Sequence, residues 1–349
     1  RYSQNDGGQK LPGLAKYFGT ISVFSGKNLA AQESHTFGSD IVNIARFGYN
    51  RATLTSQMEN TPTDVGTAIG YKNLGLRPSD WGIPRMQIIG FNPMGQTPLN
   101  QGSTSDMYQV SDTLSVQAGS HHVSLGGDIR HFRVNIFQTL NRQGLTTFGS
   151  NFTGNAVADF LLGLVLTSSY NHGGVLSNTK TTNTSLFVQD DWKVTPKFTL
   201  NLGLRWEYNT PFVERNGREG VFDATAPGGI IRLQRDPKDF GFQGTSSLLT
   251  VGGVRPGITK PFSNFAPRLG FAYNLRNNLV IRGGGGIFYG TGLSNDYSQF
   301  SQFLPPFIIA PTTVAGTQLD TLYPDVNSPT YQLPGVSPFT VDPDAKRPY

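Results

Sequence analysis

The stretch that decides the fold reads Phe198-Thr-Leu-Asn-Leu-Gly-Leu-Arg-Trp-Glu-Tyr208. Every second residue is aliphatic or aromatic, and the residues between them are polar or glycine. Successive side chains of a β-strand point to opposite faces, so this period of two predicts a strand with one apolar and one polar face. Eleven residues at about 3.3 Å each give about 36 Å, which is long for a globular protein. Aromatic residues stand at both ends of the apolar face with leucines between them, as in strands that cross an outer membrane.

A second strand precedes this one and is expected to pair with it. In Leu186-Phe-Val-Gln-Asp-Asp-Trp-Lys-Val194 the apolar residues alternate again, with Asp190 as an interruption. Thr195-Pro196-Lys197 joins the two strands as a tight turn, which predicts a long hairpin. Two more hairpins are predicted, one from residues 108–118 and 122–136 and one from residues 265–273 and 279–289. Weaker alternation gives three earlier strand candidates at residues 17–24, 41–55 and 86–91.

Long connections separate these hairpins. Residues 137–183 and 210–263 are rich in Gly, Asn, Thr and Pro, and the tail from residue 304 to 349 is rich in Pro. A short helix is expected at residues 155–162 inside the first of them. Because tight turns alternate with long connections, all tight turns fall at one end of the sheet. Short periplasmic turns and long extracellular loops are arranged in this way in outer-membrane barrels.

The composition excludes several classes of protein. The 349 residues include 42 Gly and 22 Pro, which disfavours a helical bundle, and 11% aromatic residues, which disfavours a disordered chain. The chain has no Cys, so disulfide scaffolds, thiolate metal sites and thiol nucleophiles are excluded. The net charge of +5 is spread thinly, without a run of Lys or Arg, so no nucleic-acid partner is predicted. We therefore expect an all-β chain with many turns.

No catalytic, cofactor-binding or metal-binding residues are predicted. Alternation sends Asp190 and Asp191 to opposite faces, so they cannot act together on one bond. The tetrad Gly283–Gly286 precedes a strand, so it lacks the helix N-terminus of a phosphate-binding loop. His121 and His122 lie in a turn without further ligands at metal-binding spacing. Three arginines on polar strand faces are expected to form ion pairs, or alternatively to contact a plug or an anionic solute: Arg205, Arg268 and Arg282.

Several of these segments resemble a known family. The stretch Phe187-Val-Gln-Asp-Asp-Trp-Lys-Val-Thr-Pro-Lys-Phe-Thr-Leu-Asn-Leu-Gly-Leu-Arg205 resembles the barrel of TonB-dependent outer-membrane receptors. Ala266-Pro-Arg-Leu-Gly-Phe-Ala-Tyr273 and Ile281-Arg-Gly-Gly-Gly-Gly-Ile-Phe-Tyr289 are similar to later strands of such barrels. Segments at 37–51 and 153–163 look like the Oar-like subgroup. The resemblance implies a 22-stranded antiparallel transmembrane β-barrel that holds a plug and is energised by the inner-membrane TonB complex.

Taken with this resemblance, residues 1–349 are expected to be an internal β-barrel fragment in the outer membrane of a Gram-negative bacterium. A signal peptide, a plug domain and a final barrel strand are not recognisable in the sequence, and about nine strands are visible. The expected function is active uptake of an unidentified solute, without enzymatic activity and without a cofactor. The expected partners are the TonB complex, reached through the plug, outer-membrane lipid, and a solute or a carbohydrate or peptide ligand.

Three other functions remain open at this point. A secreted β-sandwich or adhesin shares the aromatic, turn-rich composition but buries its apolar faces between two sheets. A soluble carbohydrate-active hydrolase needs two facing carboxylates, which one sequence cannot locate. A passive porin differs from the receptor only in lacking a plug.

Overall fold

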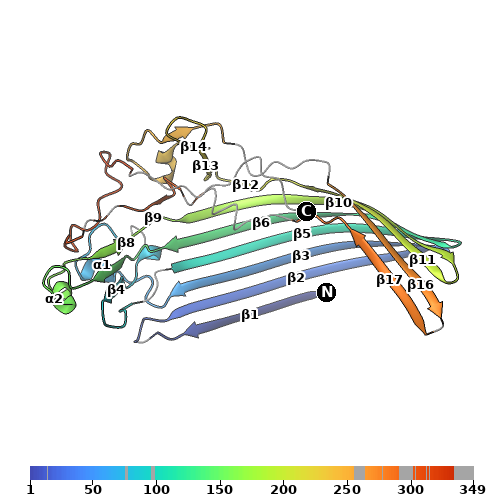
Figure 1. The fold of residues 1–349 in the computed structure, drawn as a ribbon, viewed down its shortest axis with the longest axis horizontal. Helices are drawn as coiled ribbons and strands as arrows, with labels where there is room; N and C mark the ends of the chain where they lie inside the picture. The colour runs from blue at the N-terminus through green and yellow to red at the C-terminus, as the bar shows by residue number, and fades with distance from the viewer. Residues whose placement is uncertain are drawn as a thin grey trace.

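The computed structural model describes residues 1–13, 15–74, 78–95, 99–254, 264–276, 278–290, 302, 304–311, 313 and 315–333. One long, curved antiparallel sheet dominates it (Figure 1). Nine strands follow one another in a single path, in the order β1-β2-β3-β5-β6-β10-β11-β16-β17, and β12 joins the sheet beside β10. Their bounds are β1 Tyr2–Leu11, β2 Thr20–Phe37, β3 Ile41–Met58, β5 Leu99–Ala118, β6 His121–Leu140, β10 Val175–Thr195, β11 Phe198–Asn209, β12 Val213–Glu214, β16 Phe265–Arg276 and β17 Leu279–Gly286.

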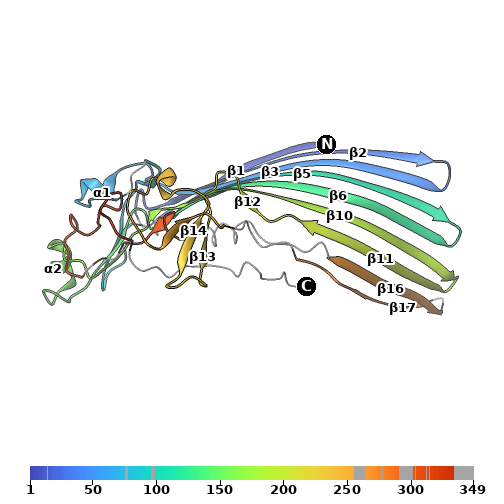
Figure 2. The ribbon, with the colours of Figure 1, turned by 90° about the horizontal axis from the view of Figure 1, so that it is seen from above.

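Short and long connections separate to the two ends of this sheet, as predicted. Residues 38–40, 119–120, 196–197 and 277–278 join successive strands at one end. The described residues of the connections 59–98, 141–174 and 210–264 lie at the other end, where the loops gather in both views (Figures 1 and 2). The shorter connection between β1 and β2 lies at this end as well. The three predicted hairpins are β5–β6, β10–β11 and β16–β17. Between the described strands the sheet does not close, and β1 and β17 are its edges.

Most of the strands are longer than the sequence pattern predicts, whereas β17 ends at Gly286, short of the predicted residue 289. β2 runs to Phe37, although the alternation suggests an end at residue 24, and β1 was not predicted at all. β6 continues to Leu140 and β10 begins already at Val175, so both strands include residues that were expected to be loop. The third early candidate is confirmed in part as β4 (Arg85–Ile88), which ends before residue 91 and pairs with β7 (Leu145–Phe148) outside the main sheet. In each case ladder hydrogen bonds to a neighbour, rather than amphipathic alternation, hold the strand.

The long connections fold into a cap on the end of the sheet. We use "loop cap" for the described residues of 59–98, 141–174, 210–254 and 302–333. It holds three small sheets, β4-β7-β8, β13-β14-β15 and β9-β18. It also holds the helices α1 Val65–Ala68, α2 Ala156–Leu161, η1 Pro78–Asp80 and η2 Pro237–Phe240, and its further strands are β8 Thr167–Ser169, β9 His172–Gly173, β13 Gly220–Asp223, β14 Ile230–Leu233, β15 Leu249–Val251 and β18 Ile308–Ile309. The predicted helix at 155–162 is confirmed as α2, whose first N–H groups at Val157 and Ala158 donate to the Asn155 side chain.

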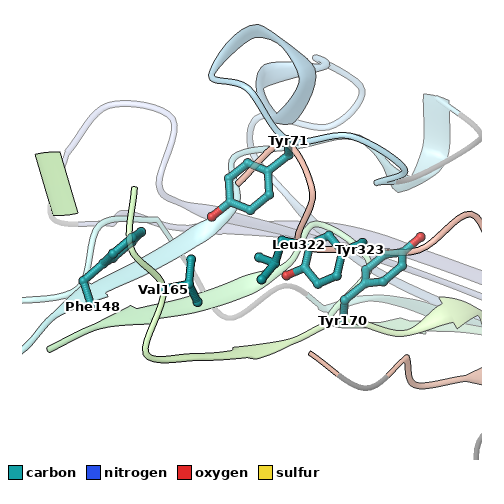
Figure 3. Close-up of a cluster of buried hydrophobic side chains, with 6 residues drawn as sticks. All are labelled: Tyr71, Phe148, Val165, Tyr170, Leu322 and Tyr323. Atoms are coloured by element: carbon teal, nitrogen blue, oxygen red, sulfur yellow. The ribbon is translucent and has the colours of Figure 1, made fainter. Parts of the chain in front are cut away.

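The buried hydrophobic residues lie mainly in this loop cap. One cluster contains Tyr71, Phe148, Val165, Tyr170, Leu322 and Tyr323 (Figure 3). The buried hydroxyls of Tyr71 and Thr146 are hydrogen-bonded at 2.7 Å. A second cluster gathers Ile231, Leu233, Leu304 and Phe307. The cap therefore has cores of its own, built from residues far apart in the sequence. None of its described helices is both long and apolar enough to cross a membrane.

Candidate functional site

The apolar face of the sheet runs across β6, β10, β11 and β16 near the tight turns, whereas the hydrogen-bonded Asn43 and Asp112 interrupt it on β3 and β5. Leu204 of β11 lies opposite Val188 of β10, which lies opposite Leu125 of β6. These side chains and their neighbours are uncovered, up to 58% exposed for Val110 and 56% for Leu269. A β-sandwich would cover such a face with a second sheet, and no described strand lies over it. An uncovered apolar face of this extent suits contact with lipid.

Aromatic residues bound this apolar face on two sides. Near the tight turns, the rings of Phe198 and Tyr273 lie 6.3 Å apart and those of His121 and Trp192 5.1 Å apart. Midway along the strands, Tyr49 and Tyr108 are paired at 5.0 Å. On β11 the face runs from Phe198 to Tyr208, about 33 Å along the strand, or about 25 Å at the usual strand tilt. We call this region the apolar band, and its height matches that of an outer-membrane barrel.

The same face becomes polar immediately beyond Tyr49 and Tyr108. Asp106 accepts a hydrogen bond from the Tyr49 hydroxyl at 2.8 Å and lies 3.5 Å from the guanidinium of Arg51. The hydroxyls of Thr53 and Thr104 follow at 3.3 Å. This outer half of the sheet therefore has a hydrated face directly above the apolar band.

The opposite face carries hydrogen-bonded polar side chains at the level of the apolar band. Arg205 is 2.7 Å from Glu207 and also donates to the Ser185 hydroxyl at 2.8 Å. Arg130 and Asp128 pair at 2.8 Å on β6, which lies on the other side of β10. The expected ion pair of Arg205 is confirmed, whereas the Arg268 guanidinium lies 4.8 Å from the Phe288 ring and Arg282 stands opposite Ala272. A face that carries charged side chains such as these is stable in contact with water, and the inner wall of an outer-membrane barrel provides that contact.

The two adjacent aspartates lie on opposite faces, as predicted. Asp190 lies on the apolar face, 2.7 Å from Nδ1 of His121 and close to the tight turn. Asp191 lies on the polar face and accepts a hydrogen bond from Asn201 at 2.6 Å. Neither arrangement resembles a catalytic pair, and no cluster of three or more potential metal-ligating His, Asp or Glu side chains occurs in the described part of the chain.

The loop cap also covers a strand edge of the main sheet. β11 ends at Asn209, so the first part of β10 would otherwise present unpaired backbone groups. Gln302 accepts from the Leu176 N–H at 2.8 Å and donates to its carbonyl at 3.3 Å, as a neighbouring strand would. Glu214 accepts from the Asn178 N–H at 2.9 Å. The described residues of 302–307 are thus partly a packing element, with Leu304 and Phe307 buried.

Two pockets differ in place and chemistry. A pocket of about 800 Å³ lies beside the Thr195–Lys197 turn, lined by Phe198, Phe271, Tyr273 and Ile281 on the apolar face. A smaller pocket of about 190 Å³ lies inside the loop cap, lined by residues that include Arg142, His172 and Arg218. Sequence reasoning did not single out these three loop residues, because loop contacts have no periodic signal.

The comparison with protein-family models agrees with this geometry. A family model described as an outer membrane beta barrel domain matches residues 1–349. No curated protein matches the chain. Solved structures that match include the outer membrane transporter YddB from Escherichia coli, at 10% sequence identity and a TM-score of 0.46, over 90% of this chain and 32% of that one. The chain thus spans about a third of the length of that transporter.

Proposed function

The chain belongs to the outer membrane β-barrel domain family and lies in the outer membrane, and from this premise we propose that it is the barrel portion of a TonB-dependent, Oar-like transporter. Its strands form part of a 22-stranded barrel whose polar face lines the interior and whose apolar band contacts lipid. The end with tight turns faces the periplasm, and the loop cap faces the cell exterior.

The separation of short turns from long, folded connections is the observation that carries this proposal. A pore that only lets solutes diffuse has no need of a cap with its own hydrophobic cores, whereas a receptor needs an outer surface that holds a ligand. The similarity of residues 187–205, 266–273 and 281–289 to TonB-dependent barrels supports the same function. The uncovered apolar band argues against the secreted β-sandwich.

In the proposed mechanism, the barrel binds and guides the solute without covalent chemistry. The solute is captured by the loop cap and a plug domain, and force transmitted by TonB moves the plug. The ion pairs of the polar face, such as Arg205 with Glu207, hold the inner wall rigid and hydrated during this movement.

Planar-bilayer conductance of the complete protein tests the proposal against a passive porin. A plugged receptor is expected to conduct almost no ions and to bind the purified periplasmic domain of TonB. Stable, open conductance in the absence of any plug-denaturing agent, together with no binding of that domain, would establish the porin instead.

A further inference from the structure

The larger pocket lies beside the tight turn between β10 and β11, at the end of the sheet away from the loop cap (Figure 2). Its volume of about 800 Å³ is within the usual range for sites that bind small molecules. Its apolar walls are Phe198 of β11, Phe271 and Tyr273 of β16, and Ile281 of β17. Because these four side chains share the apolar face, the pocket opens towards lipid and not towards the barrel interior.

The strand register explains why this pocket stays open towards the middle of the apolar band. Tyr273 of β16 lies opposite Ile281 of β17. The next pair on the same face is Phe271 with Gly283, and the Phe271 ring lies so close over Gly283 that a Cβ there would be 2.8 Å from it. Gly285 follows on β17, where a Cβ would meet no atom within 4 Å. No large side chain of β17 closes the pocket on this side, so an acyl chain lying on the Phe271 ring can continue into the apolar band.

The end of the pocket at the tight turns is basic. Lys197 lines the pocket, and Arg276 lies opposite Leu279, nearer the turn between β16 and β17. Neither of these two cationic side chains forms an ion pair with a described residue. Asp190, a carboxylate on the same face of the sheet, is held by His121 at 2.7 Å. A lysine stem lies along apolar surface while its ammonium group stays at the level of the lipid headgroups, so this end of the pocket attracts an anionic group.

We propose that this pocket binds an anionic phospholipid, of the phosphatidylglycerol class, from the leaflet that faces the periplasm. The phosphate lies beside Lys197, and one acyl chain lies against the rings of Phe271 and Tyr273. The pocket is continuous with the apolar band, so a lipid reaches it without leaving the membrane. A cation at the membrane surface favours an anionic headgroup over a zwitterionic one. The choice of a phospholipid over lipopolysaccharide rests on the proposed function, in which the tight turns face the periplasm.

Native mass spectrometry of the complete protein in detergent tests this proposal, with phosphatidylglycerol and phosphatidylcholine of identical acyl chains as probes. Lys197→Gln is expected to weaken binding of the first phosphatidylglycerol about fivefold, because one cation at the headgroup level is lost, and to leave phosphatidylcholine binding unchanged. The matched control is Lys193→Gln, which removes the same charge at the same level of the sheet. Lys193 lies opposite Thr199 on the polar face, outside the pocket, so this control is expected to bind both lipids as the unaltered protein does.

Probe comparisons on the unaltered protein decide the question even if Lys197→Gln does not fold. Phosphatidylglycerol is expected to bind about fivefold or more tightly than phosphatidylcholine. Glycerol 3-phosphate carries the phosphate without acyl chains and is expected not to displace it. Equal binding of the two lipids, displacement by equimolar glycerol 3-phosphate, equal losses in the two lysine variants, or tighter binding of lipid A than of phosphatidylglycerol would each overturn the proposal. Conductance and TonB binding do not involve this pocket, so failure of the lipid site and failure of the proposed function are distinguished.

Discussion

Four glycines of the main sheet lie directly opposite phenylalanines in the strand register. The pairs are Gly7 with Phe24, Gly102 with Phe137, Gly126 with Phe187 and Gly283 with Phe271. In each pair the ring covers the glycine so closely that a Cβ would lie within 3 Å of it. The rings thereby shield backbone that has no side chain of its own, a known means of fixing the register of strands.

Gly126→Ala is expected to lower the free energy of unfolding by about 2 kcal/mol, because the added methyl group has no room between the Asp112 carbonyl and the Phe187 ring. A Cβ on Gly126 would lie 2.3 Å from the Asp112 carbonyl oxygen and 2.9 Å from the Phe187 ring. Gly285→Ala is the matched control, since a Cβ there meets no atom within 4 Å. Urea unfolding of both variants, followed by the electrophoretic shift between folded and unfolded barrel, checks the difference. If the two variants have equal free energies of unfolding, the contact with the Phe187 ring does not restrict the size of the side chain at position 126.

Glu219 makes the stability of the loop cap depend on pH. Burial raises the pKa of its carboxyl to about 7, and the nearby charge of Glu214 adds to this rise. The folded state therefore holds a proton that the unfolded state releases above its ordinary pKa near 4.5. The stability contributed by this proton is complete below about pH 4.5, declines as the pH rises, and is gone above about pH 7.

Glu219→Gln is expected to remove this pH dependence, which amounts to on the order of 3 kcal/mol between pH 5 and 8. Hydrogen exchange of the β13 and β14 amides, normalised to intrinsic rates at each pH, measures opening of the cap. The unaltered protein is expected to open more readily at pH 8 than at pH 5, and the variant to open equally at both. If opening of the cap depends on pH equally in the unaltered protein and in Glu219→Gln, the titrating group is a residue other than Glu219.

At the level of the elements, the membrane-spanning parts of β5, β10 and β11 could be predicted from sequence, whereas the outer parts of β5 and β10 and all of β1 could not. β11 alternates strictly because lipid lies on one side and water on the other. Beyond Tyr49 and Tyr108, water reaches the face that carries Arg51 and Thr104, so the selection for apolar residues on that face ends. The alternation fades although the strand continues, and this is why all of β1 was missed. Residues 29–37 of β2 lie at the level of the apolar band, and they were missed for a different reason, because Glu33 and His35 interrupt their alternation.

Single cysteines along β5 test this change of environment, since the chain has no cysteine of its own. Val110→Cys and Thr104→Cys lie on the same face, because even positions of β5 share it, and Ser111→Cys lies on the other. Spin labels at Val110 are expected to collide with oxygen dissolved in lipid, and labels at Thr104 and Ser111 with a water-soluble nickel complex. If labels at Thr104 and Val110 collide equally often with oxygen, lipid reaches Thr104. That result would contradict the assigned apolar band.

The loop cap could not be predicted because its contacts are not local. Asn73 donates to the carbonyl of Tyr323, 250 residues away, at 2.9 Å. Arg142 and Arg218 reach the same pocket from different connections. Of this region, the sequence supports only the loop lengths and α2, whose Asn155 cap is a local signal. Ion pairing of Arg205 was predictable for the same reason, since Glu207 is two residues away on the same face.

For the whole molecule, the two open edges and the apolar band govern behaviour in water. β1 and β17 carry unpaired backbone groups within the described sheet, and the band exposes side chains such as Val110 and Leu269. Residues 1–349 expressed alone are expected to aggregate in aqueous buffer and to stay dispersed with a β-rich circular dichroism spectrum in detergent. Sedimentation velocity in the two buffers makes the comparison. A monodisperse, detergent-free monomer would contradict the lipid-facing assignment of the band.

β5 is long enough to hold the loop cap at a distance from the lipid bilayer. Its 20 residues extend about 66 Å, of which the apolar band accounts for about half. With the loop cap facing outwards as proposed, the other half of β5 rises roughly 25 Å above the apolar band at the usual strand tilt, towards the layer of surface sugars. The cap is then the part of the protein that antibodies and bacteriophages meet first, so resistance to either is expected to arise by substitutions in the cap, and rarely in the strands below it.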